Sequence, residues 1–121
     1  MNSKPVRLLV IGLTACLILT ACGGGGSQQT QSVTIQGADI KYDITALTGK
    51  VGQPIKVTLQ NTGALEHSFV IDELNVKIEG VQAGQSGEAT FTPQSAGTYE
   101  YYCNVVGHKE AGMTGTLTVS Q

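Results

Sequence analysis

Basic residues are scarce in this sequence of 121 residues, which has seven Lys and Arg against nine Asp and Glu. Two of the seven, Lys4 and Arg7, lie in an N-terminal segment that we expect to be removed, which leaves a net charge of −4. The remaining five lysines form no basic stripe that would neutralise phosphates. Nucleic acid is therefore not expected as a partner, and we expect the mild acidity to serve mainly solubility.

Tryptophan is absent and aromatic residues make up only 5% of the chain, whereas glycine occurs 16 times. Together with many Val, Thr and Ser, this composition favours short strands and turns, and no long amphipathic helix or internal repeat is found. About 100 residues follow the N-terminal segment, which is enough for one domain with one core. An all-β domain is the first expectation.

The N-terminal apolar run, Leu8 to Leu19, follows the two basic residues and is shorter than the roughly 20 apolar residues that span a bilayer. Residues 1–21 are therefore predicted to be a signal peptide. The run ends in Leu19-Thr20-Ala21-Cys22, which resembles the bacterial lipoprotein processing box and implies a lipid on Cys22. The alternatives are an uncleaved signal anchor and a secreted protein in which this cysteine is incidental. All three place the domain outside the cytoplasm.

Residues 22–31 contain four successive glycines and several glutamines but no apolar side chain to bury beyond the predicted lipidated cysteine. They are predicted to form a flexible tether, with the globular domain over residues 32–121. About eight short strands are expected in it, bounded by Gly, Pro and Asn turn signals: Ser32–Gln36, Asp39–Thr45, Ile55–Gln60, His67–Ile71, Val76–Val81, Glu88–Thr92, Thr98–Tyr102 and Gly115–Ser120. This regular spacing favours a sandwich or barrel.

Cys103 is the single thiol left in the predicted domain, so it has no partner for a disulfide within the chain. A buried cysteine acting as a small apolar residue is the simplest explanation. However, His108 and Met113 follow it at Cys-x4-His-x4-Met spacing, and thiolate, imidazole and thioether together suit copper. Zinc would be expected to recruit more Cys, His or carboxylate and to make little use of Met.

His67 is the only other histidine and is the candidate for a third strong ligand. The two-residue period of a strand aligns it with Phe69 and Ile71 on an apolar face, so a hydrogen-bonded structural histidine is the alternative. The same period turns Cys103 inward at a strand end. Gly107 and Gly112 precede the two downstream ligands and permit tight turns that bring them back to one point.

The stretch Tyr101 to Val119, with Asn61, Thr62 and Glu66 to Ile71 upstream, resembles the signature of the cupredoxins. The similarity covers roughly thirty residues and is greatest to the plastocyanin, azurin and auracyanin group, while the gap lengths leave the subfamily open. It implies a Greek-key β-sandwich holding one type 1 copper. The implied ligands are His67 Nδ1, Cys103 Sγ, His108 Nδ1 and, as a long axial ligand, Met113. Periplasmic oxidase domains share the motif but are usually longer or carry extra copper ligands.

The resemblance also places further residues near the copper. Family members often have Asn directly after the first His ligand, whereas this chain has Ser68. Asn104, directly after Cys103, is expected to supply the amide in its place and to hydrogen-bond Ser68. The alternative is that Ser68 and Asn104 only satisfy backbone groups of their own turns. The ring edge of His108 is expected to lie at the surface, within an apolar partner-docking rim. The residues expected in that rim are Val105, Val106, Ala111 and Gly112. Tyr102 matches a second docking position, or is simply an outward strand residue.

Four protein ligands leave no open position for a substrate, so the chain is not expected to be an enzyme. The favoured function is a monomeric, membrane-tethered carrier of single electrons between redox proteins such as membrane complexes or cytochromes. It would work on the periplasmic side or the cell surface. A copper delivery or storage protein is the alternative, although such proteins more often use several exchangeable Met or His residues. The third possibility is a metal-free β-sandwich with an adhesive or structural role.

Overall fold

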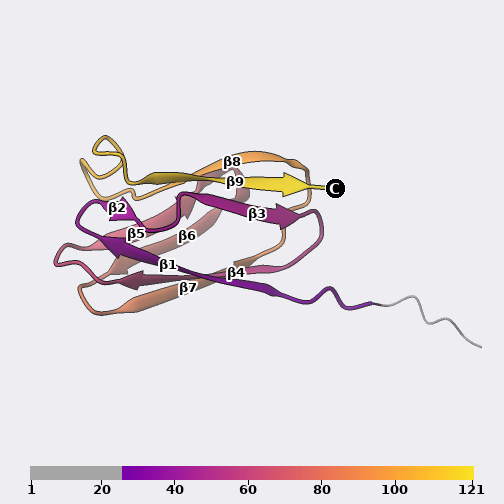
Figure 1. The fold of residues 1–121 in the computed structure, drawn as a ribbon, viewed down its shortest axis with the longest axis horizontal. Helices are drawn as coiled ribbons and strands as arrows, with labels where there is room; N and C mark the ends of the chain where they lie inside the picture. The colour runs from indigo at the N-terminus through magenta and orange to yellow at the C-terminus, as the bar shows by residue number, and fades with distance from the viewer. Residues whose placement is uncertain (1–25) are drawn as a thin grey trace, which may run out of the picture.

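The computed structural model describes residues 26–121, which form a sandwich of two β-sheets (Figure 1). The first sheet has the order β2-β1-β4-β7 and consists of β1 (Gln31–Ala38), β2 (Lys41–Tyr42), β4 (Ile55–Asn61) and β7 (Ser86–Phe91). The second has the order β3-β9-β8-β5-β6 and consists of β3 (Ala46–Lys50), β5 (His67–Ile71), β6 (Val76–Val81), β8 (Gly97–Tyr102) and β9 (Thr114–Ser120). The predicted all-β sandwich is confirmed.

Helical structure within residues 26–121 is limited to one 3₁₀ turn, η1 (Asp72–Leu74), between β5 and β6. No helix in this range is long and apolar enough to cross a membrane. The predicted signal peptide and Cys22 lie outside the described residues.

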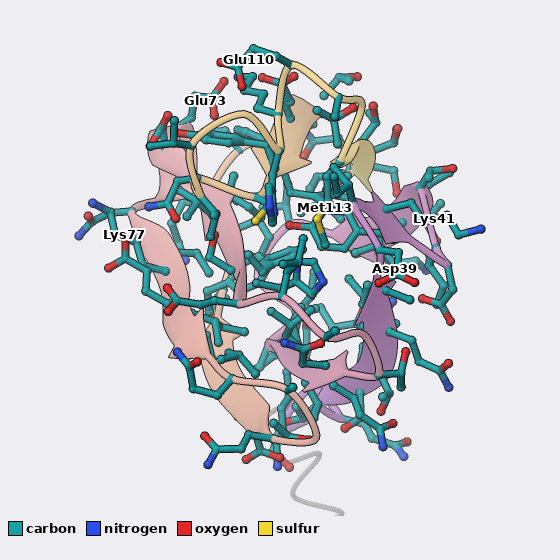
Figure 2. All side chains as sticks on the ribbon, turned by 90° about the vertical axis from the view of Figure 1, so that its left-hand side faces the viewer. Asp39, Lys41, Glu73, Lys77, Glu110 and Met113 are labelled. Carbon is teal, nitrogen blue, oxygen red and sulfur yellow. The ribbon has the colours of Figure 1, made fainter. Side chains whose placement is uncertain are left out.

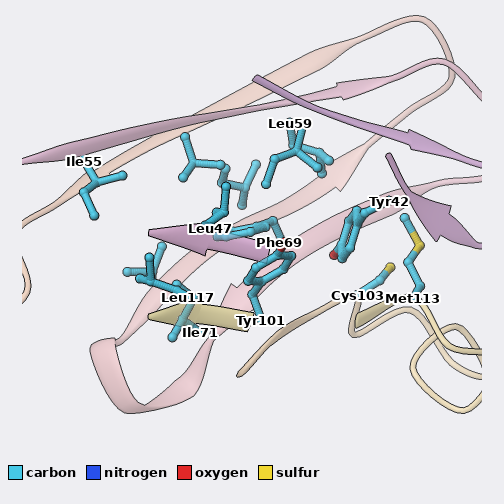
Figure 3. Packing of buried hydrophobic residues seen from close by; sticks show 14 of the residues in the cluster. Tyr42, Leu47, Ile55, Leu59, Phe69, Ile71, Tyr101, Cys103, Met113 and Leu117 are labelled. Carbon is cyan, nitrogen blue, oxygen red and sulfur yellow. The ribbon is translucent and has the colours of Figure 1, made fainter. Parts of the chain in front are cut away.

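The core lies between the sheets because alternate residues of each strand turn inward. In β4, Ile55, Val57 and Leu59 are buried while Lys56 and Thr58 between them are partly exposed. Phe69 and Tyr101 of the second sheet pack against each other with ring centroids 4.9 Å apart, and Tyr42 joins them (Figure 3). This aromatic group separates the aliphatic part of the core from the sulfur-bearing side chains at one end.

The structure has nine strands where about eight were expected, and the difference lies in residues 39–50. The predicted strand Asp39–Thr45 is wrong: Asp39 and Ile40 adopt positive φ angles of 29° and 66°, which form a turn, and only β2 remains extended there. Instead, β3 crosses to the second sheet and pairs in parallel with β9. Gly49 is one of the glycines predicted to mark a turn between strands; this prediction is wrong, because Gly49 lies within β3 and pairs with Val119 in this ladder.

Candidate metal centre

Four sequence-predicted ligands meet at the end of the sandwich where β8 turns into β9. His67 is the first residue of β5, Cys103 directly follows β8, and Met113 directly precedes β9. The side chains of these three are fully buried, and His108, from the connecting loop, is 6% exposed. Figure 2 looks onto this end and shows Met113 near its middle, with charged side chains toward the margins.

The loop from Cys103 to Met113 is folded by its own backbone. The Cys103 N–H donates to the Met113 carbonyl and the Met113 N–H donates to the His108 carbonyl, both at 3.0 Å. Gly107 and Gly112 have φ angles of 85° and 97°, a region that side-chain-bearing residues rarely adopt. The predicted glycine turns are thereby confirmed, and they return the loop to its starting point.

The donor atoms converge closely enough to bind one ion. A ligand atom of each of His67, Cys103 and His108 lies within 4.8 Å of the other two, and Cys103 Sγ is 3.4 Å from His108 Nδ1. Both ring nitrogens of His67 are buried without a hydrogen-bond partner, which is costly unless a metal uses one of them. Burial, and then the neighbouring His108, lower the pKa of His67, which favours the neutral form of the ring that a metal requires.

Met113 and His67 are packed against Gly37, near the end of β1, a site residue that no sequence motif indicates. A Cβ atom at this position would lie 3.2 Å from both the Met113 Cε and the His67 Cδ2 atoms. The glycine therefore permits the close approach of a strand from the first sheet to two ligands. No local signal marks it, because the contact joins residues thirty or more positions apart.

Gly37→Ala is expected to retain copper while altering its surroundings, because the added methyl group must displace the Met113 methyl or the His67 ring by a few tenths of an ångström. The visible spectrum and reduction potential should change, with a stability loss of about 1 kcal/mol. Gly49→Ala is the matched control, since its Cβ meets the flexible end of Ile55 in the core. A spectrum identical to wild type in Gly37→Ala would contradict this role.

The loop before His67 is fixed by the buried side chain of Asn61. Its Nδ2 donates to the carbonyls of Leu65 (2.6 Å) and Val81 (2.8 Å), and its Oδ1 accepts the Gly63 N–H at 2.9 Å. Tyr42, also missed from the sequence, donates to the Ser68 carbonyl at 2.5 Å, and its burial raises its pKa. Together these bonds hold both ends of the short segment that presents His67.

Ser68 and Asn104 do bond each other across the two ligand segments. The Asn104 N–H donates to Ser68 Oγ at 2.8 Å, and Ser68 Oγ lies 2.6 Å from Asn104 Oδ1. The Ser68 N–H and hydroxyl each lie 3.4 Å from Cys103 Sγ. Such contacts orient a ligand and modulate its electron donation.

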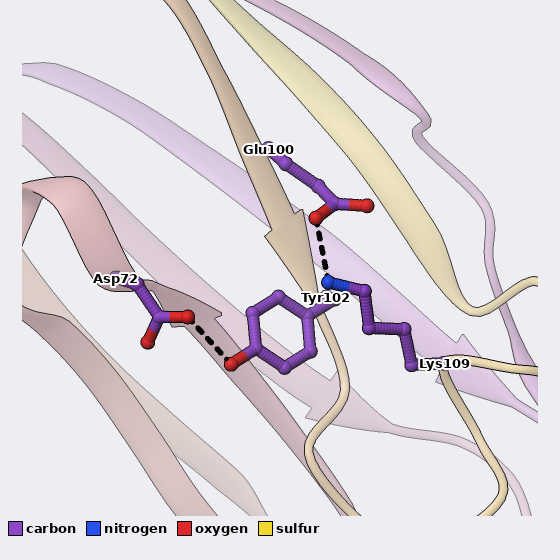
Figure 4. Close-up of polar contacts among 4 residues, drawn as sticks. All are labelled: Asp72, Glu100, Tyr102 and Lys109. Atoms are coloured by element: carbon purple, nitrogen blue, oxygen red, sulfur yellow. Dashed lines mark hydrogen bonds and ion pairs between the residues drawn. The ribbon is translucent and has the colours of Figure 1, made fainter.

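The residues predicted to form the docking rim differ in their exposure to solvent. Val106 is 97% exposed and Ala111 and Gly112 are exposed, whereas Val105 is half-buried and packs against the core. Tyr102 is half-buried as well, and its hydroxyl donates to Asp72 at 2.8 Å while Lys109 lies 3.9 Å from its ring centroid (Figure 4). Lys109 also pairs with Glu100 at 2.6 Å, which ties the residue after His108 back to β8.

Two imidazoles, a thiolate and a thioether buried at one end of a β-sandwich define a type 1 copper protein, with a single site formed by His67, Cys103, His108 and Met113. A family model described as "Cupredoxin-like domain" matches residues 9–119. The chain belongs to the cupredoxin family.

Comparisons with known proteins agree with the site. The chain is 30% identical to Auracyanin-A of Chloroflexus aurantiacus, over 95% of this chain and 98% of that protein. It is 27% identical to the copper-resistant cuproprotein CopI of Rubrivivax gelatinosus, over 79% and 70% of the two chains. The crystal structure of dithionite-reduced auracyanin from Roseiflexus castenholzii superposes with a TM-score of 0.70 at 25% identity, covering 75% of this chain and 98% of that one. The protein is thus an auracyanin-like type 1 copper protein.

Proposed function

We propose that the protein is a membrane-tethered, monomeric carrier of single electrons between extracytoplasmic redox proteins. The observation that carries this proposal is the closed ligand set: all four ligand side chains are at most 6% exposed, which leaves no room for a substrate at the metal. Bound copper supplies a one-electron couple between Cu(II) and Cu(I). The dithionite-reduced state of the related auracyanin supports a site of this kind that accepts electrons.

The residues of this chain would keep the site rigid and provide an edge for electron exchange. The backbone bonds of the Cys103–Met113 loop and the Asn61 side chain hold the ligands in place, which limits rearrangement during electron transfer. His108 is the ligand nearest the solvent, and Val106 provides an apolar surface in its loop. A small apolar contact favours brief encounters with a partner.

The proposed anchor fits the direction in which the chain leaves the domain. The described residues preceding β1 leave the sandwich at the end opposite the β8–β9 loop (Figure 1). A lipid on Cys22 and a flexible tether would therefore join the domain at the end opposite the copper site; Gln31, the last residue of the predicted tether, already belongs to β1. Cys22→Ser should abolish palmitate labelling of the full-length precursor, without changing the visible spectrum.

The experiment that tests electron transfer is reversible redox cycling of the copper-loaded protein. We expect an intense blue band that disappears on dithionite reduction and returns on oxidation. We also expect fast electron exchange between oxidised and reduced copies of the protein, which NMR line broadening measures. Slow exchange, or loss of copper at each cycle, would contradict the carrier function.

Val106→Lys is expected to slow this electron self-exchange about tenfold at low salt, because a charge replaces the exposed apolar contact near His108. The band and potential should change little, since Val106 is not a ligand. Ala96→Lys, an exposed position in the loop at the opposite end of the sandwich, is the matched control. Equal self-exchange rates in the two variants would show that electrons do not pass through the Val106 surface.

Copper delivery or storage is the second candidate, favoured by the similarity to CopI, whose name describes copper resistance. A delivery protein should release copper readily. Transfer of Cu(I) to a chelator such as bathocuproine within seconds, without an intense blue oxidised state, would support this function over electron transfer.

A further inference from the structure

The Ser68 hydroxyl lies between two possible acceptors for its proton, the Asn104 side chain and the Cys103 sulfur. This oxygen lies 2.6 Å from Asn104 Oδ1 and 3.4 Å from Cys103 Sγ, and both are acceptors. A hydroxyl has a single proton, so only one of them receives it. The orientation of the Asn104 amide decides between them.

That orientation is set by Glu79, a residue of β6 with no other evident role at the site. Asn104 Nδ2 lies 2.6 Å from Glu79 Oε1. A carboxylate only accepts hydrogen bonds, so it holds the NH₂ end of the amide and leaves the oxygen end facing Ser68. The Ser68 proton is then drawn to Asn104 Oδ1, and Cys103 Sγ keeps the Ser68 backbone N–H as its donor.

A β-bulge brings Glu79 to this position. His67 pairs with Val81 and Phe69 pairs with Ile78, so two residues of β6, Glu79 and Gly80, stand opposite the single residue Ser68. Gly80 has a φ of 68°, as the extra glycine of such a bulge requires. Glu79 therefore shares the outer face of the sheet with Ser68 while Val81 still turns into the core.

We propose that Glu79 is a positioning residue that orients the Asn104 amide and thereby turns the Ser68 hydroxyl away from the Cys103 sulfur. Without Glu79 the amide is free to rotate and donate to Ser68 Oγ, which then directs its proton to the sulfur. A second donor on the sulfur withdraws electron density from it and favours the reduced copper. The bulge and Glu79 thus keep the reduction potential of the copper lower than it would be if the Ser68 hydroxyl donated to the sulfur. The inference rests on the copper site and not on the proposed electron-carrier function or anchor.

The test is the potential of copper-loaded Glu79→Ala, alone and combined with Ser68→Ala. When Ser68 is present, we expect Glu79→Ala to have a higher reduction potential than wild type and a thiolate-to-copper band at shorter wavelength. In the Ser68→Ala background, Glu79→Ala should shift the potential only by the effect of its lost charge and leave the band in place. Glu66→Ala, which removes another exposed carboxylate near His67, is the control and should give equal shifts in both backgrounds. Equal Glu79→Ala shifts in both backgrounds, or a lowered potential, would overturn the proposal.

A measurement independent of Ser68→Ala uses NMR of the diamagnetic Cu(I) protein. In wild type, the Asn104 Nδ2 protons should show nuclear Overhauser effects to the Glu79 side chain. In Glu79→Ala they should show them to the Ser68 Hβ protons instead, as the amide turns. An Asn104 amide that keeps its wild-type orientation in Glu79→Ala would overturn the proposal, whether or not the protein transfers electrons.

Discussion

Cys103→Ser is expected to abolish the intense blue absorption completely. That band arises from charge transfer between a thiolate and copper, and Cys103 is the only free cysteine of the described domain. A serine hydroxyl does not replace the thiolate, because it stays protonated and binds copper poorly. Visible absorption of the copper-titrated variant measures the loss, and survival of the colour would contradict the ligand assignment.

The fold of Cys103→Ser must be checked in the same experiment, since the side chain is fully buried. Circular dichroism should show an intact sandwich. Copper should raise the melting temperature of the wild type, because a ligand that binds only the folded state stabilises it, and should no longer do so in the variant. Met113→Leu is the matched comparison: it should retain copper and colour but change the reduction potential, because the axial ligand modulates the potential without being the main anchor.

Gly115→Ala is expected to give the largest loss of stability, about 3 kcal/mol, which corresponds to roughly 15 °C in melting temperature. Gly115 of β9 pairs with Tyr101 of β8, and an added Cβ would overlap the Tyr101 ring. The ring has no free space to move into: it is fully buried, packs against Phe69 and donates to the Ile44 carbonyl at 2.7 Å. Burial also raises the pKa of Tyr101 to about 12, so it remains a neutral donor.

Urea unfolding of the metal-free protein measures this effect without the contribution of copper. Gly97→Ala in the same β8–β9 ladder is the control; its Cβ would meet the Tyr99 ring at an ordinary 3.6 Å, and a change within about 0.5 kcal/mol is expected. In a Tyr101→Leu background the cost of Gly115→Ala should fall below about 1 kcal/mol. Equal stability of Gly115→Ala and Gly97→Ala would show that the ring does not occupy this space.

Residues near one another in the chain made much of the site predictable. Cys103, His108 and Met113 lie within eleven positions, and the strand period already turned the cysteine inward, as the structure confirms. The strands Ile55–Gln60, His67–Ile71 and Val76–Val81 agree with the structure to within a residue, because their apolar alternation or β-branched content marks them. The predicted strand at residues 39–45 failed because positive φ angles at Asp39 and Ile40 carry no local signal.

The sequence by itself determined the fold class, the metal and three of its ligands, since strand periodicity and a short ligand motif are local properties. It reached His67 because no other histidine remained and because residues Glu66 to Ile71 resemble the upstream ligand segment of the cupredoxins. Tertiary structure alone decided that Gly37 packs under Met113, that Gly115 makes room for Tyr101, and that Glu79 reaches Asn104. The first contact comes from packing of one sheet against the other, the second from strand pairing and the third from a β-bulge. Their distances depend on the register between strands, which the two-residue period of a single strand does not specify.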